Sequence, residues 1–594
     1  MLALALDFEP FSLENGLLSS VRKRMRPNLK RKYGKRLEAM YVEIERKRQQ
    51  ELAALKDPKS PLTVLQKVVK ALEASLGVEG IDPGTTKTFE EMGGDSLGTV
   101  SFSMFLEDIF GIEIPVNAII SPAGNPRRWA QLIETTLKSG STSAPTFAKI
   151  HGKGARALHA RDLKIERFLD PQATAATEAP TAETRTVLLT GANGFLGHIL
   201  CLGWMERLAQ VNGKVICLIR AGNDAAARKR LDDVFSGVDK DLEEHYRALA
   251  AKHLEVIAGD VAEPGLGLTP QTWERIANEV DHIVHPGALV NHVLSYEHLF
   301  GPNVFGTAEL IRLALTKRQK RLDFVSSMAA AYRVDTGKRN DEDSPLLESL
   351  SLGDGYADGY GATKWADEVL LHDAHQRFGL PVNVFRGDMM MPHTRYKGQI
   401  NVPDMFTRLL FSVVTTGLAP ESFYEPGPDG KRARAHYDGL PVDFIAGAMI
   451  GIGAQAHRDI RTYNVVNHHA DDGVSLDSVI DWIQSAGYAV DRISDHAQWF
   501  KSFEARLTAL TEAQRQQSSI AILGMFRRRY PAHEAPIGSE HFAAAVRELP
   551  PELQTGPDVP HLTEAYIHKY LDDMRLLGLI GEAQRTVDAV AVAA

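Results

Sequence analysis

Apolar residues recur at helical spacing in the first part of the chain. Between residues 61 and 77 they stand three or four positions apart, which predicts a helix that ends at Gly77. A second apolar helix is expected to begin at Ser96, and a third to follow Pro126. The spacing therefore predicts a small four-helix domain over residues 57–138.

Short β-rich runs take over after residue 185 and alternate with helical stretches. The runs are TVLLTG (186–191), KVICLIR (214–220), LEVIAGD (254–260), HIVHPGA (282–288), LDFVSSM (322–328) and VNVFRGD (382–388). This alternation predicts an α/β fold, a Rossmann-type doubly wound parallel sheet with helices on both faces. Beyond about residue 390 the pattern predicts a mostly helical substrate lobe, which includes one more strand-like run at 462–467.

The pattern also gives the boundaries of the predicted parts. Residues 1–56 are too few to bury a core, and we predict the tail of a preceding domain and a linker helix there. The four-helix domain at 57–138 follows. Residues 139–185 are small, polar and proline-containing, which is linker composition, although LKIERFLD (163–170) is apolar enough to dock on a neighbour. Residues 186–594 form the α/β part.

Composition excludes several classes of protein. With 594 residues, 44% hydrophobic and 24% charged, the chain has the make-up of a folded multidomain protein. The net charge of −9 does not favour a nucleic-acid partner, and the basic stretch from Arg22 to Arg36 is expected to be a solvated helix face. Two cysteines, no secretory leader and no run of about 18 apolar residues lead us to expect a cytoplasmic protein without a membrane partner.

A serine stands at the start of the second predicted helix, within GGDSL (93–97). GDSLG also fits the nucleophile elbow of hydrolases, but that motif follows a strand and TFEEMGGD has no strand pattern. A helix N-terminus tolerates an attached phosphate, and glycines let an enzyme approach; a plain N-cap is the alternative role of Ser96. The motif and its apolar helix resemble a thiolation (peptidyl carrier) domain. That resemblance implies that Ser96 carries 4′-phosphopantetheine, added by a phosphopantetheinyl transferase, whose thiol holds an acyl thioester.

Glycines follow the first strand of the predicted sheet and open a helix. Between a strand and a helix this spacing indicates a dinucleotide site, because glycines permit the tight turn and put the pyrophosphate on the helix N-terminus. The residues expected to contact the cofactor are Gly191, Asn193, Gly194, Phe195, Leu196 and Gly197.

The end of the next strand discriminates between the two nicotinamide cofactors. An NAD site has Asp or Glu there for the ribose hydroxyls, whereas this chain has Arg220. A guanidinium pairs with the 2′-phosphate of NADPH and gains nothing from a hydroxyl. We therefore predict NADPH, held by Arg220 and secondarily by Arg230. Asp260, after the third strand, either reaches the adenine or is a surface carboxylate.

Tyr360 and Lys364 form a Y-x-x-x-K pair on one face of a predicted helix. Ser326 and Ser327 end the strand before it. We expect the ammonium to lower the pKa of the phenol, which makes it a usable acid at neutral pH, while a serine hydroxyl holds the substrate oxygen. After a dinucleotide loop, this pair indicates carbonyl reduction.

Residues 185 to about 470 resemble the extended short-chain dehydrogenase/reductase family, and within it the thioester-reductase branch. The motifs that carry the resemblance are TGANGFLG, HPGALVNH, NVFGT, VSS and YGATKWADE. The resemblance implies that the catalytic residues are Ser327, Tyr360 and Lys364. It also implies that the cofactor is lined by His285, Gly287, Ala288 and Asn303.

Two further features could belong to a metal site or to a substrate-binding site. The neighbouring histidines His282, His285, His292 and His298 lack an H-E-x-x-H spacing and a cysteine partner, so we expect satisfied polar histidines and no metal. Residues 385–410 follow the sixth strand, where the acyl chain and the pantetheine arm are expected to enter. In them Asp388 is predicted to be a buried carboxylate, and Met389–Met391 either an adaptable wall or ordinary core.

A carrier followed by a reductase implies that the second part acts on the cargo of the first. Residues 10–41 look like the tail of an adenylate-forming domain, so the whole chain resembles the C-terminal half of the carboxylic acid reductase family. The resemblance implies NADPH-dependent release of a carrier-bound acyl thioester as an aldehyde, after acid activation by an upstream adenylation domain. The alternative is the terminal reductase module of a non-ribosomal peptide or polyketide synthetase, which releases aldehyde or alcohol. A carrier that binds nucleotide without catalysis is disfavoured by the intact Ser327, Tyr360 and Lys364.

Overall fold

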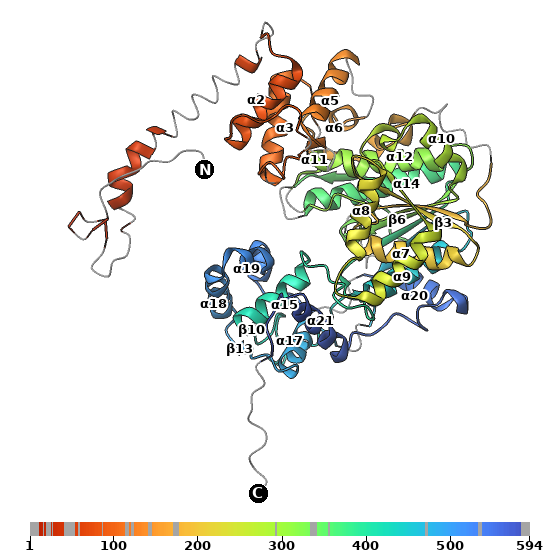
Figure 1. Cartoon of the computed structure of the whole chain (residues 1–594). Coiled ribbons are helices and arrows are strands. Elements are labelled where there is room, and N and C mark those ends of the chain that lie inside the picture. The colour runs from red at the N-terminus through yellow and green to blue at the C-terminus, as the bar shows by residue number, and fades with distance from the viewer. Residues whose placement is uncertain are drawn as a thin grey trace. The chain divides into compact units, whose positions relative to one another are not determined.

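The chain forms two compact units, Met1–Ser143 and Ala144–Ala594, in a computed structural model (Figure 1). The structure describes residues 11–583 except for 13, 16, 19–24, 26–27, 38, 41–53, 57–59, 86, 95, 113, 115–117, 120–123, 140–144, 170–177, 292–293, 333–340, 354–356, 470–472 and 533–536. Most of residues 1–56, predicted to be the tail of an adenylation domain and a linker helix, lies outside these residues. Within them, every helix is too short or too polar to traverse a lipid bilayer.

Three described helices enclose the apolar core of the first unit. They are α2 (Val64–Leu76), α3 (Ser96–Phe110) and α5 (Pro126–Ser139). α2 begins with a capping box between Thr63 and Gln66 and ends at Gly77, as predicted. The rings of Phe89 and Trp129 both pack on Phe102, with centroid distances of 5.4 Å, so the unit has a core of its own. The sequence gives no position for the fourth helix of the predicted unit, and residues 115–117 and 120–123, between α3 and α5, lie outside the described part of the chain.

Part of the predicted linker 139–185 is folded onto the second unit. Its elements are α6 (Phe147–His151), β1 (Ala157–His159), η1 (Ala160–Asp162) and η2 (Ile165–Arg167). β1 pairs antiparallel with β7 (Ser349–Ser351), and the LKIERFLD segment buries Ile165 and Leu169 in the core beneath, as predicted for its docking. The predicted linker is therefore too wide, and we call residues 146–169 the strap.

A seven-stranded parallel sheet organises the second unit, in the order β12-β8-β6-β5-β2-β3-β4. The strands are β2 (Thr186–Thr190), β3 (Lys214–Ile219), β4 (Leu254–Ala258), β5 (His282–His285), β6 (Arg321–Ser327), β8 (Val382–Gly387) and β12 (Ile460–Val465). The predicted doubly wound α/β fold is confirmed. One detail is wrong: the run at 462–467 belongs to β12, the edge strand of this sheet, and not to the helical lobe, because its apolar side chains pack with those of β8.

Helices cover both faces of the sheet. One face packs against α7 (Phe195–Ala209), α8 (Asp224–Phe235), α9 (Lys240–His253) and α16 (Val442–Gly453). The other packs against α10 (Pro270–Glu279), α12 (Gly306–Ala314), α14 (Asp358–Phe378) and the strap. Figure 1 shows α10, α12 and α14 above the sheet and α7 and α9 below it. Between β5 and α12 the chain forms α11 (Tyr296–Leu299) and a π-helical stretch, η5 (Phe300–Phe305).

A mostly helical lobe with its own core completes the unit, as predicted. Its main helices are α15 (Met405–Thr416), α17 (Leu476–Ser485), α18 (His496–Ala509), α19 (Glu512–Gln517) and α21 (Glu564–Leu576). The short strands are β9 (Met390–Met391), β10 (Leu418–Pro420), β11 (Leu440–Pro441) and β13 (Asp491–Ile493). The remaining short elements are η4 (Pro264–Gly267), α13 (Met328–Ala331), η7 (Ser519–Phe526), α20 (Glu540–Arg547) and η8 (Pro551–Leu553).

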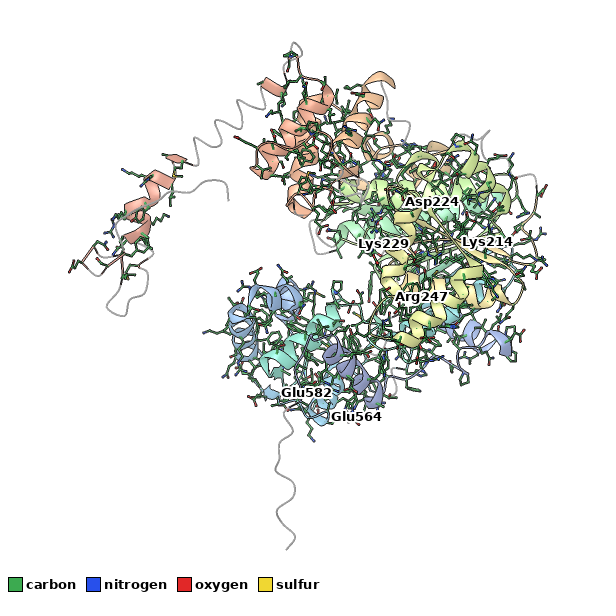
Figure 2. The ribbon with its side chains drawn as sticks, in the orientation of Figure 1. Lys214, Asp224, Lys229, Arg247, Glu564 and Glu582 are labelled. Atoms are coloured by element: carbon green, nitrogen blue, oxygen red, sulfur yellow. The ribbon has the colours of Figure 1, made fainter. Side chains whose placement is uncertain are left out.

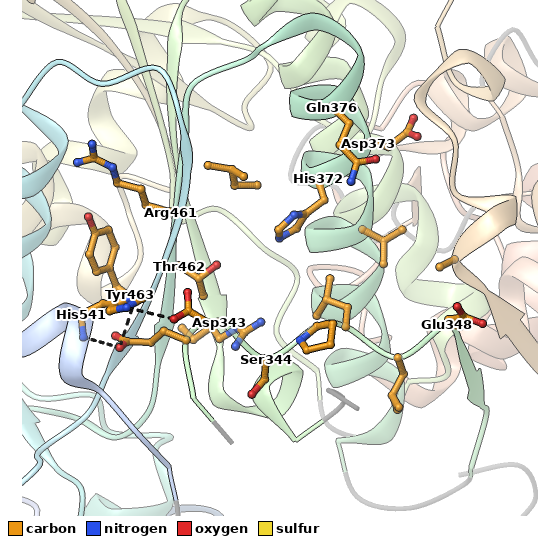
Figure 3. Close-up of a pocket in the computed structure, with 18 of the residues that line it drawn as sticks. Asp343, Ser344, Glu348, His372, Asp373, Gln376, Arg461, Thr462, Tyr463 and His541 are labelled. Atoms are coloured by element: carbon orange, nitrogen blue, oxygen red, sulfur yellow. Dashed lines mark hydrogen bonds and ion pairs between the residues drawn. The ribbon is translucent and has the colours of Figure 1, made fainter. Parts of the chain in front are cut away.

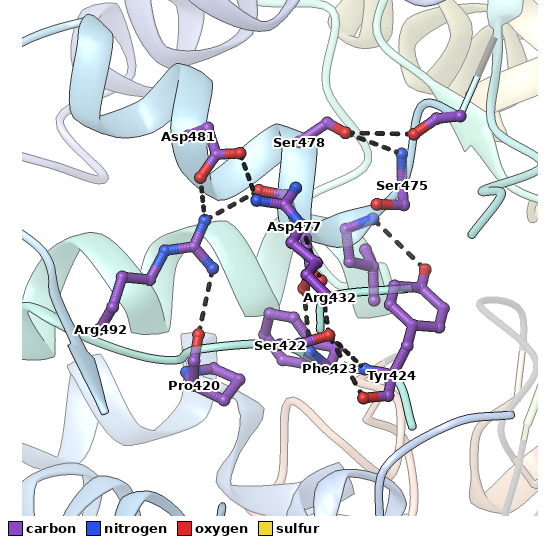
Figure 4. A network of polar contacts seen from close by, with 12 residues as sticks. Pro420, Ser422, Phe423, Tyr424, Arg432, Ser475, Asp477, Ser478, Asp481 and Arg492 are labelled. Carbon is purple, nitrogen blue, oxygen red and sulfur yellow. Dashed lines mark hydrogen bonds and ion pairs between the residues drawn. The ribbon is translucent and has the colours of Figure 1, made fainter. Parts of the chain in front are cut away.

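A buried carboxylate ties the lobe together (Figure 4). Asp477, with no exposed surface, accepts hydrogen bonds from the Ser422 hydroxyl at 2.6 Å and the Phe423 amide at 2.9 Å. Arg432 approaches the same carboxylate at 3.3 Å. This network joins α17 to the segment after β10.

An ion-pair cluster lies at the amino ends of β3 and β4, the edge of the sheet opposite the predicted site. Lys214, labelled in Figure 2 at the start of β3, lies 2.8 Å from Glu255 and 3.2 Å from Glu279. The residues expected to form the site follow the carboxyl ends of the same parallel strands, which meet at one edge.

Candidate active site

In the dinucleotide loop, the backbone after β2 packs closely against the backbone after β5. Gly191 has a φ of 62°, and a Cβ there would lie 2.6 Å from the Cα of Gly287. A Cβ on Gly197 would lie 1.9 Å from the carbonyl oxygen of Gly191. Gly194 caps α7, and its amide donates to that carbonyl at 2.9 Å. The glycines are therefore required by the packing, and the loop presents the N-terminus of α7 as the sequence predicts. Asn193 and Phe195 are half-buried, Leu196 is buried, and Ala288 follows Gly287 at the end of β5.

Arg220 and Arg230, which are predicted to select NADPH, lie near Asp260 after β3 and β4. Arg230 donates a hydrogen bond to the carbonyl of Arg220. Burial and the charge of Arg220 lower the pKa of Arg230, whereas burial raises the pKa of Asp260 against the opposing effect of Arg220. Two guanidinium groups near one another repel, and a doubly negative phosphate would offset that repulsion. The Asp260 carboxylate accepts from the Ala262 amide at 3.0 Å, which leaves both of its predicted roles open.

Ser327, Tyr360 and Lys364 come from β6 and α14, at the carboxyl edge of the sheet. The Lys364 ammonium, 2% exposed, donates to the carbonyl of Val325 at 2.8 Å and lies 5.9 Å from the centre of the Tyr360 ring. The Ser327 hydroxyl caps α13 by accepting from the Ala329 amide at 3.2 Å.

The electrostatics of this group differ from the prediction in one respect. Burial and the Asp367 carboxylate raise the pKa of Tyr360, so the expected lowering by Lys364 is not found. Burial lowers the pKa of Lys364 in turn, because the charged form is desolvated. The Tyr360 phenol is therefore protonated at neutral pH but is a weaker acid than an ordinary tyrosine in this environment.

Asn303 joins the cofactor side to the helix that carries Tyr360. It lies in η5; its side-chain oxygen accepts from the Leu289 amide at 2.8 Å and its amide nitrogen donates to the Thr363 hydroxyl at 3.0 Å. Thr363 donates in turn to the carbonyl of Tyr360 at 2.7 Å. Sequence reasoning missed Thr363, because one threonine inside a helix carries no distinguishing pattern.

The histidines make local polar contacts but are not all satisfied as predicted, because both ring nitrogens of His282 and Nε2 of His285 are buried without a hydrogen-bond partner among the described residues. His285 lies 2.6 Å from the Thr190 hydroxyl, and burial together with Lys364 lowers its pKa to about 3, so it is neutral. His282 lies 3.0 Å from Asp323, and His298 lies 2.7 Å from the Ser295 hydroxyl. His292 lies outside the described residues. Among the residues that the structure describes, no group of three or more His, Cys, Asp or Glu side chains could hold a metal ion.

The segment after β8 is tied to several elements. The Lys397 amide donates to Asp239 at 2.7 Å and the Gly398 amide to Asp573 at 3.0 Å. Met391 is buried in the lobe core, which favours ordinary packing for that residue. Asp388, just after β8, keeps exposed surface, so its predicted burial is only partly right: desolvation and the Asp438 carboxylate still raise its pKa to about 7.

A separate cavity of about 1050 Å³ lies beside β12, α14 and α20 (Figure 3). It is lined among others by Glu342, His372, Arg386, Arg461 and His541. Of the described residues, the predicted catalytic ones do not line it.

In the carrier motif, the structure explains why positions 93 and 94 are both glycine. Gly93 has a φ of 99°, and a Cβ on Gly94 would lie 2.0 Å from the ring of Phe89. Ser96 is the first residue of α3, as predicted, while Asp95 and the Ser96 side chain lie outside the described part.

Fold and site together define a nucleotide-binding α/β reductase joined to a helical carrier unit. Residues 189–449 match the NAD-binding family described as Male sterility protein, and residues 66–133 match the Phosphopantetheine attachment site family. The reductase (R) domain of a nonribosomal peptide synthetase from Mycobacterium tuberculosis is 41% identical, with a TM-score of 0.66 over 72% of this chain and 100% of that domain. The chain therefore belongs to the family of these reductase domains.

Two curated relatives extend the similarity. A carboxylic acid reductase of Segniliparus rugosus is 45% identical over 97% of this chain and 49% of its own length. An isonitrile lipopeptide synthase of Mycobacterium tuberculosis is 40% identical over 88% of this chain and 21% of its own length. Nearly the whole chain is thus homologous to carboxylic acid reductases and spans about half of their length.

Proposed function

We propose that the chain is the carrier and reductase half of a carboxylic acid reductase, which releases an acyl thioester held on Ser96 as an aldehyde with NADPH. The observation that carries the proposal is the presence in one chain of a carrier unit and of a dinucleotide loop beside Ser327, Tyr360 and Lys364. The 97% coverage by a carboxylic acid reductase supports the same arrangement.

The residues fit an NADPH site, since the glycine loop presents the N-terminus of α7 and the guanidinium groups of Arg220 and Arg230 follow β3. When bound, NADPH supplies the hydride for the carbonyl carbon. Tyr360 donates its proton to the carbonyl oxygen as hydride adds to the carbon. The C–S bond then breaks, the hydroxyl proton passes to the sulfur, and the aldehyde and the free thiol of the carrier are released. Ser327 holds that oxygen, and the Lys364 ammonium stabilises the phenolate that remains on Tyr360. His285, Gly287, Ala288 and Asn303 position the cofactor.

The proposal includes partners and a location. A phosphopantetheinyl transferase modifies Ser96, and an upstream adenylation domain activates the acid. The buried free thiols of Cys201 and Cys217 suit a reducing compartment, so we propose the cytoplasm.

The test is to treat the full chain with a phosphopantetheinyl transferase and benzoyl-coenzyme A, and then to add NADPH or NADH. We expect a mass gain at Ser96, faster oxidation of NADPH than of NADH, and benzaldehyde as product. Ser96→Ala should lose carrier-dependent turnover but still reduce a soluble benzoyl thioester. Tyr360→Phe should lose both reactions; full activity in that variant would refute the catalytic assignment.

A peptide-synthetase terminal reductase is the second candidate, favoured by the identity to the isonitrile lipopeptide synthase and the complete coverage of the R domain. The same loaded chain distinguishes the two. Release of simple acyl groups as aldehyde supports the first candidate, whereas a preference for peptidyl thioesters or conversion to alcohol supports the second.

A further inference from the structure

A buried polar group lies directly behind the predicted catalytic residues. The Ser326 hydroxyl donates to Glu368 at 2.5 Å, and the Arg386 guanidinium donates to both carboxylate oxygens of Glu368 at 2.7–3.1 Å. These side chains are 3%, 0% and 1% exposed. We call Ser326, Glu368 and Arg386 the brace.

The brace joins the two elements that carry the catalytic residues. Ser326 on β6 and Arg386 on β8 are partners in the strand register, and Ser327 is the next residue of β6. Glu368 lies on α14, four residues after Lys364 and so on the same face. The Lys364 ammonium contacts the carbonyl of Val325 at 2.8 Å. Two polar contacts one helical turn apart therefore hold α14 against the end of β6.

Stability alone does not account for this arrangement. A buried ion pair is generally no more stabilising than well-packed apolar residues of similar volume, since both charges are desolvated. Arg386 also keeps one guanidinium nitrogen, Nη1, buried without a hydrogen-bond partner among the described residues. Such a nitrogen is costly, so the pair is poorly optimised for stability. The contacts of the pair do, however, fix the distance between α14 and the strands β6 and β8.

We propose that Glu368, with Ser326 and Arg386, is a positioning residue that sets α14 against β6 so that Tyr360 and Ser327 meet one substrate oxygen. This inference rests on the proposed function. No member of the brace needs to contact substrate, because the brace acts through the placement of its neighbours in the chain.

The brace also sets the charge around Lys364. The charged or titratable groups near that ammonium are Asp367 and Glu368 on its own helix, Tyr360 one turn earlier and His285 on β5. Burial lowers the pKa of Lys364, and the two carboxylates partly restore it. Loss of the charge of Glu368 should lower that pKa further. The alkaline limb of the pH–rate profile should then move to lower pH.

The test measures the activity of four variants of the full chain, with a soluble benzoyl thioester and NADPH as substrates. Ser326→Ala removes one hydroxyl and keeps the ion pair. Glu368→Gln removes the charge, and Glu368→Gln with Arg386→Met removes the buried unpaired cation as well. Asp477→Asn is the matched control, because Asp477 is an equally buried carboxylate that bonds a serine and faces an arginine, in the lobe.

We expect Ser326→Ala and Glu368→Gln to lower kcat by up to about 10²-fold with the KM for NADPH within about twofold, the size of effect that a ~1 Å misplacement has on catalysis. Only the Glu368 variants should shift the alkaline limb. The double variant should regain thermal stability relative to Glu368→Gln but keep the low kcat. Asp477→Asn should lose thermal stability with kcat and pH profile unchanged.

Two results would overturn the inference: kcat that recovers together with stability in the double variant, or an unshifted alkaline limb in Glu368→Gln. If the wild-type chain reduces no thioester, the proposed function fails separately. The pKa of Lys364, read by NMR of the chain labelled at lysine Cε, then decides about the brace: it should fall in Glu368→Gln and stay unchanged in Asp477→Asn. An equal pKa in wild type and Glu368→Gln contradicts the inference.

Discussion

Replacement of Gly191 by alanine should disrupt the dinucleotide loop through two separable effects. The φ of 62° costs about 1–2 kcal/mol for a residue with a Cβ. The new Cβ would also lie 2.6 Å from the Cα and 2.8 Å from the amide nitrogen of Gly287. Carbon atoms in contact prefer about 3.5 Å or more, so the ends of β2 and β5 have to separate by about 1 Å. Both neighbours are backbone atoms and cannot rotate away.

The total loss of stability should be about 2–5 kcal/mol, since overpacking adds about 1–3 kcal/mol to the φ strain. The shifted turn should also lose one backbone contact to the pyrophosphate. A hydrogen bond to a charged group contributes about 1.5–3 kcal/mol, which corresponds to about a tenfold to hundredfold weaker Kd for NADPH.

Gly379→Ala is the matched control for this experiment. Gly379 has a φ of 64° at the end of α14, and a Cβ there would meet no atom within 4 Å. It should lose only the strain of about 1–2 kcal/mol and keep the wild-type Kd for NADPH. Urea unfolding measures the free energies, and nucleotide fluorescence titration measures Kd. Wild-type NADPH affinity in Gly191→Ala, or an equal loss of affinity in Gly379→Ala, would refute the reasoning.

Three further predictions address the cofactor, the carrier and the strap. Arg220→Ala should weaken the Kd for NADPH by about tenfold to a hundredfold and leave that for NADH within about twofold, measured by titration; equal losses for both would contradict the assignment. Gly94→Ala, whose Cβ would lie 2.0 Å from Phe89, should destabilise the carrier by about 1–3 kcal/mol and lower modification at Ser96, while reduction of a soluble thioester is unchanged. Burial raises the pKa of Asp373, but hydrogen bonds from the Ile165 amide and Lys164 outweigh it and hold the pKa below its ordinary value. Its contribution to stability is therefore fully present above the ordinary carboxylate pKa and is lost as the pH falls through the lowered one. Asp373→Asn should flatten this acid dependence in thermal unfolding and expose the strap, residues 146–169, to protease. An unchanged acid limb would count against the role of Asp373 in holding the strap.

The sheet could be predicted from the sequence because each strand is a short apolar run next to a glycine or a polar residue. The first six strands match the predicted runs closely, and the glycine loop lies where its spacing indicates. β12 was predicted as a strand but assigned to the wrong part, since a run of six residues does not reveal which sheet it joins. The strap was only partly foreseen: Ile165 and Leu169 are too few to predict a docking face without the surface that they cover.

The candidate catalytic residues were found through local motifs, whereas their environment was not. Thr363 and Glu368 carry no pattern of their own, and Ser326 was noted only as the neighbour of Ser327. Their contacts join residues 18 to 60 positions apart. The raised pKa of Tyr360 was missed for the same reason: burial depends on all the elements around a side chain, not on the distance to one lysine.

The sequence by itself determined the order of the parts, the class of sheet, the serine at the start of α3 and the residue types of the candidate site, because these depend on periodicity and on contacts within a few residues. Only the tertiary structure decided the place of β12 and the strap, the reason for each glycine, the protonation tendency of Tyr360 and the brace behind it. Those properties come from desolvation and from contacts between distant segments, and no local pattern encodes which distant atoms a folded chain brings within 3 Å.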